Sequence, residues 1–214
     1  MNRLVILGVG PQARVIPDLL SALSDWELVG FVDCRDERPC LVGDAAAYAV
    51  FDGSDFPETI ARQTGIFRPL IALSRMGHRK EWIRKIGELG MDPATLIHPT
   101  AVLSRSAEIG RGCLICPGVI IGPGVKIGDH CIINSASTID HDSVLEENVI
   151  LAAGVHLPGF VRVGSGTFIG VGSCAVNHVT IGRDCLIGAG SVVTKDLLDG
   201  ILAAGVPAKE IRKL

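Results

Sequence analysis

Aromatic side chains are scarce in this sequence of 214 residues, because Phe, Trp and Tyr together supply nine positions, or 4%. Seven of the nine lie in the first 98 residues, and only Phe160 and Phe168 lie beyond them. Ile, Val and Leu instead supply 64 positions, and glycine supplies 26. A core of aliphatic residues and glycine favours thin, regular layers over an irregular globular interior, which usually contains more aromatic bulk.

Several other features are missing, and each absence excludes a class of protein. No apolar run approaches the roughly 18 residues of a membrane-spanning helix, so the mean hydropathy of +0.41 indicates a buried core and no membrane insertion. The net charge of −3 gives no reason to expect a nucleic-acid partner. The seven cysteines are odd in number and follow no secretory signal, which argues against a disulfide scaffold and predicts a cytoplasmic location.

A six-residue repeat runs through the second half of the chain. Starting at Ile97 and ending at Val193, every sixth residue is Ile, Leu or Val at 16 of 17 positions, and the exception is Ala175. The residue two places before each of these is small or β-branched at all 17 positions. This period fits neither a helix nor a simple strand alternation. It is typical of a short strand and a turn, with one large and one small side chain facing inward.

Three such sides close a triangular coil of 18 residues, which is the hexapeptide β-helix. The same spacing predicts that Cys113, Cys131 and Cys185 stack in one inward column as small apolar residues. The Cys113-x-x-Cys116 pair looks like half of a zinc site, but no second pair exists, so we expect no bound metal.

The first half of the chain alternates strand and helix patterns, which predicts a parallel sheet. The expected strands are 3–8, 27–32 and 69–73, and the expected helices run from the first glycine turn to about Ser24 and over 78–89. The domain boundaries that follow are 1–94 for an α/β nucleotide-binding domain, 95–199 for the β-helix and 200–214 for a C-terminal tail.

The turn after the first strand reads Gly8-Val9-Gly10-Pro11-Gln12, and the next strand ends in Asp33. A glycine turn followed by an acid about 20 residues later is typical of a nucleotide site. The third glycine of the dinucleotide motif is missing and Pro11 lacks an N–H group. A loop for the phosphates of one nucleotide is therefore the preferred interpretation, and a purely structural turn is the alternative.

His141 is the best candidate for acid–base chemistry in the repeat region. It lies between Asp140 and Asp142 at an outward corner, and a carboxylate beside an imidazole can fix its tautomer and raise its basicity. One coil later, Gly159 allows a ligand to approach the backbone and offers an N–H to an oxyanion. Asn134 adds a neutral polar group nearby, and the alternative for His141 is a solvated corner histidine.

Several of these motifs together resemble one family. The chain resembles the bacterial nucleotide-sugar acetyltransferases, which include perosamine and bacillosamine N-acetyltransferases and a sialic-acid O-acetyltransferase branch. The matching features are the opening strand and glycine turn, Asp33, Ile97-His98-Pro99, Asn134, Asp140-His141-Asp142 and Gly205-Val206-Pro207-Ala208-Lys209. The resemblance implies a Rossmann-like nucleotide-binding domain and a left-handed parallel β-helix that forms a homotrimer, since a prism with flat sides suits three-fold packing.

The resemblance also implies roles for individual positions. His141 is the base that removes a proton from the sugar amine, Asp142 tunes it, Asn134 lies nearby, and the Gly159 N–H stabilises the oxyanion formed on the thioester. The co-substrate is acetyl-CoA, and the positions implied to contact it are Ile150, Gly159, Val171, Ala189 and Lys209. The positions implied to contact the nucleotide-linked amino sugar are Gly10, Pro11, Gln12, Asp33, Cys34, Ser74 and Arg79.

This chain departs from the family pattern in three places. Backbone contacts with a ligand can survive a change of side chain, and arginines near the loop at 74–76 offer positive charge to the phosphates of a nucleotide. The departures are Pro11-Gln12 in place of the last Gly and the His of a glycine-rich loop, Ser74-Arg75-Met76 in place of Gly-Asp-Asn, and Ile150 in place of a histidine.

The leading hypothesis is therefore an acetyl-CoA-dependent N-acetyltransferase acting on a nucleotide-linked amino sugar. A sugar O-acetyltransferase would use the same groups, and the sequence does not separate the two. A zinc enzyme related to carbonic anhydrase would need three imidazoles at a subunit interface, but no two histidines are spaced to stack on neighbouring coils. A non-catalytic hexapeptide-repeat protein is the remaining alternative.

Overall fold

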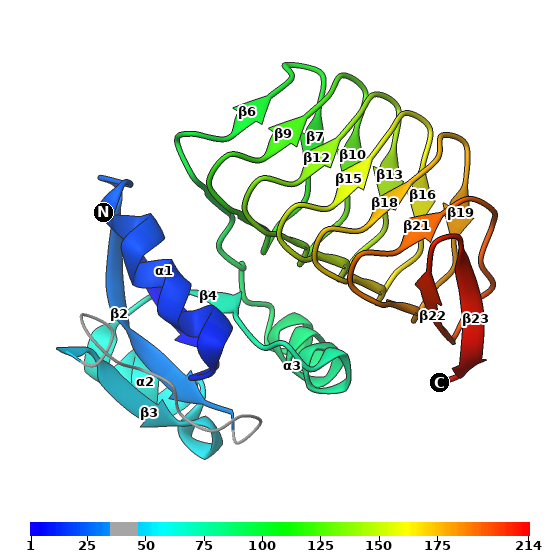
Figure 1. Ribbon diagram of the computed structural model, residues 1–214. Coiled ribbons are helices and arrows are strands. Elements are labelled where there is room, and N and C mark those ends of the chain that lie inside the picture. Colours follow the sequence, from blue (N-terminus) through cyan, green and yellow to red (C-terminus); the bar gives the residue numbers. More distant parts are fainter. Residues whose placement is uncertain (35–46) are drawn as a thin grey trace. The chain divides into compact units, whose positions relative to one another are not determined.

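The computed structural model describes residues 1–34 and 47–214 (Figure 1). The chain divides into two compact units, Met1–Thr95 and Leu96–Leu214, and each is described by itself.

The first unit is built on a parallel sheet, as the sequence predicts, and this sheet has four strands in the order β3-β2-β1-β4. The central strand β1 is buried on both of its faces, since Leu4, Val5, Ile6 and Leu7 have no exposed surface. The strands are β1 (Asn2–Leu7), β2 (Trp26–Asp33), β3 (Ala49–Asp52) and β4 (Arg68–Ile71). The helices are α1 (Pro11–Ser21), α2 (Glu58–Thr64) and α3 (Met76–Glu88), with a short 3₁₀ turn, η2 (Gly53–Asp55).

Helix α1 begins directly after the predicted glycine turn. Gly10 lies at its N-cap, and Pro11 takes the first helical turn, where a missing N–H costs nothing. The helix ends at Ser21 with Ala22 as its C-cap, three residues before the end that the sequence predicts.

The second unit is a parallel β-helix of six-residue repeats, whose coils stack in succession in Figure 1. Each coil has three faces, and each face is one strand of two residues. Face 1 contains β5 (Leu96–Ile97), β8 (Leu114–Ile115), β11 (Ile132–Ile133), β14 (Ile150–Leu151), β17 (Phe168–Ile169) and β20 (Leu186–Ile187). Face 2 contains β6 (Val102–Leu103), β9 (Ile120–Ile121), β12 (Thr138–Ile139), β15 (His156–Leu157), β18 (Cys174–Ala175) and β21 (Val192–Val193). Face 3 contains β7 (Glu108–Ile109), β10 (Lys126–Ile127), β13 (Val144–Leu145), β16 (Arg162–Val163) and β19 (Thr180–Ile181).

The strand register confirms the predicted coil of 18 residues. Ile133, for example, pairs with Ile115 on one side and with Leu151 on the other. The large and small inward columns together form one core, in which Cys113, Cys131 and Cys185 are buried as predicted.

Inward hydroxyl groups tie each coil to the next. The Ser143 hydroxyl donates to the Pro158 carbonyl at 2.9 Å and accepts the Val161 N–H at 3.0 Å. Ser137 repeats this pattern with Ala152 and Val155. A small polar residue is tolerated inside the prism because its hydrogen bonds are made by the neighbouring corner.

The corners of the coil require left-handed backbone conformations. Glycine occupies many of these positions, but the corner column between faces 2 and 3 contains Asp142, Phe160 and His178 with φ of 58°, 62° and 63°. Residues other than glycine adopt this region rarely, although the corner column between faces 3 and 1 also contains three of them, His130, Asn148 and Asp184.

The segment 200–214, which the sequence identifies only as a tail, forms a hairpin on the β-helix. Strand β22 (Ile201–Gly205) pairs in parallel with β20 and extends face 1, and β23 (Ala208–Lys213) pairs antiparallel with β22.

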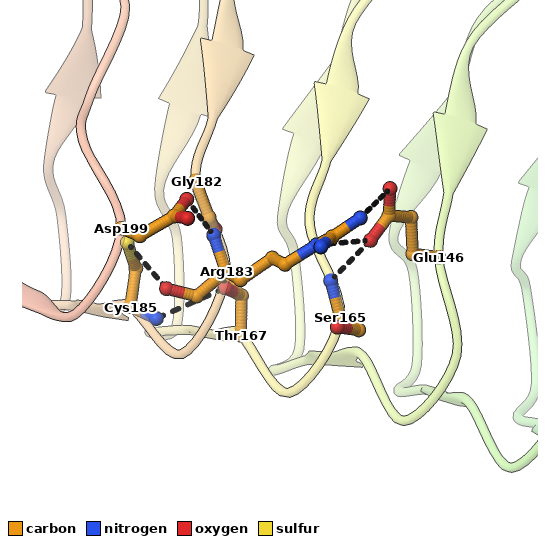
Figure 2. Close-up of polar contacts among 7 residues, drawn as sticks. All are labelled: Glu146, Ser165, Thr167, Gly182, Arg183, Cys185 and Asp199. Atoms are coloured by element: carbon orange, nitrogen blue, oxygen red, sulfur yellow. Dashed lines mark hydrogen bonds and ion pairs between the residues drawn. The ribbon is translucent and has the colours of Figure 1, made fainter.

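An ion pair links coils at the corner after face 3. Figure 2 shows the Arg183 side chain extended toward Glu146, with Nε 3.0 Å from the carboxylate. The Ser165 N–H donates to the same carboxylate oxygen at 3.0 Å. These contacts hold the pKa of Glu146 below its ordinary value, chiefly through the hydrogen bond from Arg183.

Candidate functional site

The carboxyl edge of the parallel sheet brings together six of the predicted substrate-binding residues. They lie at or just after the ends of β1, β2 and β4, and they are Gly10, Pro11, Gln12, Asp33, Cys34 and Ser74. The strand order reverses between β1 and β4, and ligands of open α/β sheets bind at such a reversal.

Gly8 lets the loop after β1 approach the loop after β4 at this edge of the sheet. Its φ is 125°, and a Cβ there would lie 3.0 Å from the Ala72 carbonyl oxygen and 3.0 Å from Leu73. Only glycine combines this backbone angle with so close a contact.

Arg79, the seventh of these residues, lies apart from the other six. Its side chain has no exposed surface, and Nη1 donates to the carbonyls of Ile71 and Leu73 at 3.0 and 3.1 Å. In this conformation the guanidinium supports the backbone that leads to Ser74 and does not reach a phosphate in solvent. Sequence reasoning missed this because an arginine on an amphipathic helix is usually exposed.

His141 and Asp142 form a hydrogen-bonded pair at the corner between faces 2 and 3. The His141 Nδ1 lies 3.0 Å from Asp142 Oδ2, and both side chains are about half exposed, at 45% and 53%. Asp140 acts on the backbone instead, because its Oδ1 accepts the His141 N–H at 2.7 Å. An ionised carboxylate can only accept, so we assign the Nδ1 proton to this bond and leave Nε2 free to accept a proton.

Gly159 lies directly against the imidazole, one coil after His141. A Cβ at this position would lie 2.6 Å from both Cε1 and Nε2 of His141, so a side chain here would displace the ring. Gly159 is buried, and its N–H donates no hydrogen bond within the part of the chain that the structure describes. The open Nε2 and this N–H therefore lie at one corner.

A groove of about 390 Å³ runs over face 2 and ends beside this corner, at Asp140 and Pro158. On its floor the Thr138 hydroxyl and His156 Nδ1 lie 2.9 Å apart, and Ile120 and Cys174 complete the row across four strands. Sequence reasoning missed this row, although the 18-residue spacing of Thr138, His156 and Cys174 could have revealed it.

The remaining predicted residues lie elsewhere on the β-helix. Asn134, Val171 and Ala189 lie at the corner between faces 1 and 2, while Ile150 and Lys209 belong to strands of face 1. Val171 is exposed, with 55% of its surface accessible, whereas Ile150 is buried, with 4% accessible. Val171 and Ala189, which are predicted to contact acetyl-CoA, thus lie at the corner between faces 1 and 2. Face 2 separates them from His141, which lies at the corner between faces 2 and 3.

Residues 1–34 and 47–214 contain no cluster of three or more potential metal ligands. No helix within those ranges has the length and apolar character to cross a bilayer.

Burial raises the pKa of Cys116 to about 11, so this thiol stays protonated at neutral pH and is a poor nucleophile.

Comparison with known proteins places the chain in a family. The family model described as bacterial transferase hexapeptide, six repeats, matches residues 106–141 and 160–195, both within the β-helix. A variant of GDP-perosamine N-acetyltransferase from Caulobacter crescentus, in complex with CoA and GDP-perosamine, is 35% identical with a TM-score of 0.88, over 100% of this chain and 98% of that one. The acetyltransferase domain of PglB from Neisseria gonorrhoeae is 30% identical with a TM-score of 0.85, over 99% of this chain and 100% of that one. The chain belongs to the bacterial nucleotide-sugar N-acetyltransferase family, which confirms the resemblance inferred from the sequence.

Curated relatives match over shorter stretches. A protein of Schizosaccharomyces pombe described as an acetyltransferase is 46% identical over 54 residues, or 25% of this chain and 26% of that protein. One from Staphylococcus aureus strain COL is 44% identical over 61 residues, or 28% of this chain and 31% of that protein. The chain therefore spans between a quarter and a third of the length of these relatives.

Proposed function

We propose that this protein transfers the acetyl group of acetyl-CoA to the amino group of a nucleotide-linked amino sugar. The observation that carries the proposal is the corner at which Asp142 holds Nδ1 of His141 and leaves Nε2 open beside the Gly159 N–H. A general base and an oxyanion donor at one corner are the two groups that direct acyl transfer needs.

The proposed reaction forms a C–N bond and breaks the C–S bond of the thioester, while one proton passes from the amine through His141 to the sulfur of CoA. The amine nitrogen attacks the thioester carbonyl carbon while Nε2 of His141 removes a proton from that nitrogen. The Gly159 N–H stabilises the tetrahedral oxyanion, and the C–S bond then breaks to release CoA as a thiolate, which takes up a proton. Asp142 stabilises the imidazolium that forms in between.

The first unit is proposed to bind the nucleotide as a Rossmann-like domain, at the carboxyl edge of its sheet. The residues proposed for this role are Gly10, Pro11, Gln12, Asp33, Cys34 and Ser74. Arg79 is proposed to act through the loop that it holds, because its guanidinium is fully buried.

Acetyl-CoA is proposed to contact the β-helix at Ile150, Val171, Ala189 and Lys209, with its thioester at Gly159. A left-handed winding and a homotrimer complete the proposal. Val171 and Ala189 lie one corner away from His141, so a neighbouring copy that contributes its own corner would complete the site. Asn134, on that same corner, would join the site in this way.

Two structures of the Caulobacter crescentus relative support a role for histidine. In these structures one histidine is replaced by alanine or asparagine, and CoA and GDP-perosamine are bound. The structure of the Neisseria gonorrhoeae domain with acetyl-CoA supports the choice of acetyl donor.

The proposal is tested by offering acetyl-CoA with UDP-, GDP- and dTDP-linked sugars that carry either an amine or a hydroxyl at the same ring position. Release of CoA and the mass of the product report transfer. We expect turnover with an amino sugar and none with its hydroxyl counterpart. Transfer to hydroxyl sugars alone would make the protein an O-acetyltransferase, and absence of acetyl-CoA binding by calorimetry would make it non-catalytic.

A further inference from the structure

Three aromatic rings follow one another along the corner between faces 2 and 3. The Phe160 ring meets the His141 ring edge to face, with centroids 5.1 Å apart and planes at 89°. The same Phe160 ring stacks on His178, with centroids 4.7 Å apart and planes inclined by 7°. The phenyl ring therefore connects the two imidazoles.

The fold alone gives no reason for a ring at this corner. Phe160 and His178 have φ of 62° and 63°, which bulky side chains seldom adopt. One coil earlier the same column contains Asp142, and the coil before that contains Gly124, both with positive φ. Phe160 is also 45% exposed, in a repeat region where Phe168 is the only other phenylalanine, tyrosine or tryptophan. An exposed ring on an unfavourable backbone points to a role in the site.

The contact with Phe160 supplies a constraint that the other contacts of His141 leave open. Asp142 fixes the position of Nδ1 at 3.0 Å, but one hydrogen bond does not fix the plane of the ring. An edge-to-face contact resists rotation of that plane. The Phe160 N–H also donates to the His141 carbonyl at 3.0 Å. This backbone hydrogen bond between successive coils holds the two residues, and therefore their rings, next to each other.

We propose that Phe160 is a positioning residue for His141 and that His178 holds the Phe160 ring in place. The inference rests on the proposed function, in which Nε2 of His141 removes a proton from the attacking amine. Proton transfer depends on the direction of the Nε2 lone pair, and a misplacement of about 1 Å can lower a rate about 100-fold. Neither Phe160 nor His178 performs chemistry in this scheme.

The test compares four substitutions in the full chain. Phe160→Leu removes the ring and Phe160→Tyr keeps it, while His178→Ser removes the stacking partner and His178→Phe keeps it. Phe168→Leu is the matched control, because it removes the other ring of the repeat region. For each variant we would measure kcat, KM for both substrates and the thermal midpoint, and would record the His141 Hε1 resonance in protein labelled with ¹³C at histidine Cε1. His141→Asn assigns that resonance by its loss.

We expect Phe160→Leu to lower kcat about tenfold or more, with both KM values changed less than about threefold, because the base is misdirected while binding is kept. His178→Ser should have a smaller effect of the same kind. Phe160→Tyr and His178→Phe should restore kcat to within about threefold of the wild type. The Hε1 resonance should shift in Phe160→Leu, because the phenyl ring current is lost, and should stay in place in Phe168→Leu.

Unchanged kcat and an unmoved Hε1 resonance in folded Phe160→Leu would overturn the proposal. A rise in KM with unchanged kcat would also overturn it, since Phe160 would then be a binding residue. If the wild type transfers no acetyl group, or if His141→Asn keeps full turnover, the proposed function fails instead. In that case the Hε1 resonance alone decides whether Phe160 orients the His141 ring.

Discussion

The position of the His141 ring depends on its contacts with Asp142, Gly159 and Phe160. Asp142 accepts from Nδ1, and Gly159 leaves the space in which Nε2 and Cε1 lie. The hydroxyl of Ser143 holds the corner that carries Gly159, through the Pro158 carbonyl and the Val161 N–H. The position of the His141 imidazole therefore depends on a corner one coil away, as well as on its own carboxylate partner.

Replacing Gly159 with alanine should displace the His141 imidazole without unfolding the chain. The new Cβ would lie 2.6 Å from His141 Nε2 and Cε1, so we expect kcat/KM to fall by at least about tenfold. Gly154→Ala is the control, because Gly154 has φ of 65° and no atom within 4 Å of an added Cβ. The control should lower stability by about 1 kcal/mol and leave turnover unchanged. Equal turnover of the two variants would contradict the role given to Gly159.

The sequence predicts the parts of the site that depend on spacing. The 18-residue coil brings Gly159 to His141, and the structure has this contact. The spacing does not tell which of the two flanking acids binds the imidazole, since this depends on the left-handed backbone at Asp142. Only the family resemblance points to Asp142. Arg79 is a second example, because its complete burial depends on tertiary packing that a helical pattern does not contain.

At the scale of elements, the Glu146–Arg183 ion pair is a test of how much an exposed contact contributes to the β-helix (Figure 2). The side chains are 42% and 60% exposed, so we expect Glu146→Gln to lower the free energy of unfolding by about 0.2–1 kcal/mol at neutral pH. The folded-state pKa of Glu146 lies below its ordinary value of 4.5. This contribution is therefore present above that value and is lost as the pH falls through the lowered pKa.

Urea denaturation of Glu146→Gln and of the wild type at several pH values measures this difference. Glu147→Gln is the matched control, because the neighbouring Glu147 side chain makes no ion pair within the described ranges. A difference between Glu146→Gln and the wild type that persists at the acid end of the series would contradict the account.

Arg79 should contribute more to stability than any exposed arginine of helix α3. Removing its guanidinium in Arg79→Met leaves the carbonyls of Ile71 and Leu73 without these donors, which should cost about 1–3 kcal/mol. Arg84→Met removes an exposed pair with Glu88 on the same helix and should cost less than about 0.5 kcal/mol. Denaturant midpoints of the two variants check the order, and the reverse order would show that Arg79 has no structural role.

The elements that the sequence predicts well are those with a repeated inward pattern. From Ile97 to Val193 a large and a small inward residue alternate, with Ala175 as the one exception among the large ones, and this fixes the strands. Strand β3 and helix α2 went unpredicted because one is a four-residue strand at the sheet edge and the other has only seven residues. The hairpin of β22 and β23 lies beyond the last repeat, and it forms by pairing with the exposed edge of face 1.

At the scale of the whole chain, the uneven distribution of aromatic residues reflects two packing rules. The interior of the β-helix consists of small and aliphatic side chains, whereas the core of the first unit includes Phe56, Phe67 and Trp82 in edge-to-face contacts. A triangular coil has room for one large aliphatic and one small residue on each side. The corners are free of this limit, and Phe160 lies at one of them.

The separation of the predicted acetyl-CoA corner from His141 leads to a prediction about assembly. In a homotrimer whose sites form between copies, His141→Ala and Ala189→Trp are each inactive alone but should complement each other when refolded or expressed together. Random mixing should restore about a quarter of the wild-type turnover, since each site takes one corner from each of two copies. Light scattering should give three times the 22.5 kDa monomer mass. No recovery in mixed trimers would place both corners of a site on one copy.

The central claim is that His141 is the base of acetyl transfer, and His141→Asn tests it most directly. With the best amino-sugar nucleotide from the substrate screen, we expect kcat to fall by about 10²–10⁴, while the thermal midpoint and the Kd for acetyl-CoA stay unchanged. Turnover within a few-fold of the wild type in the folded, acetyl-CoA-binding variant would contradict the account.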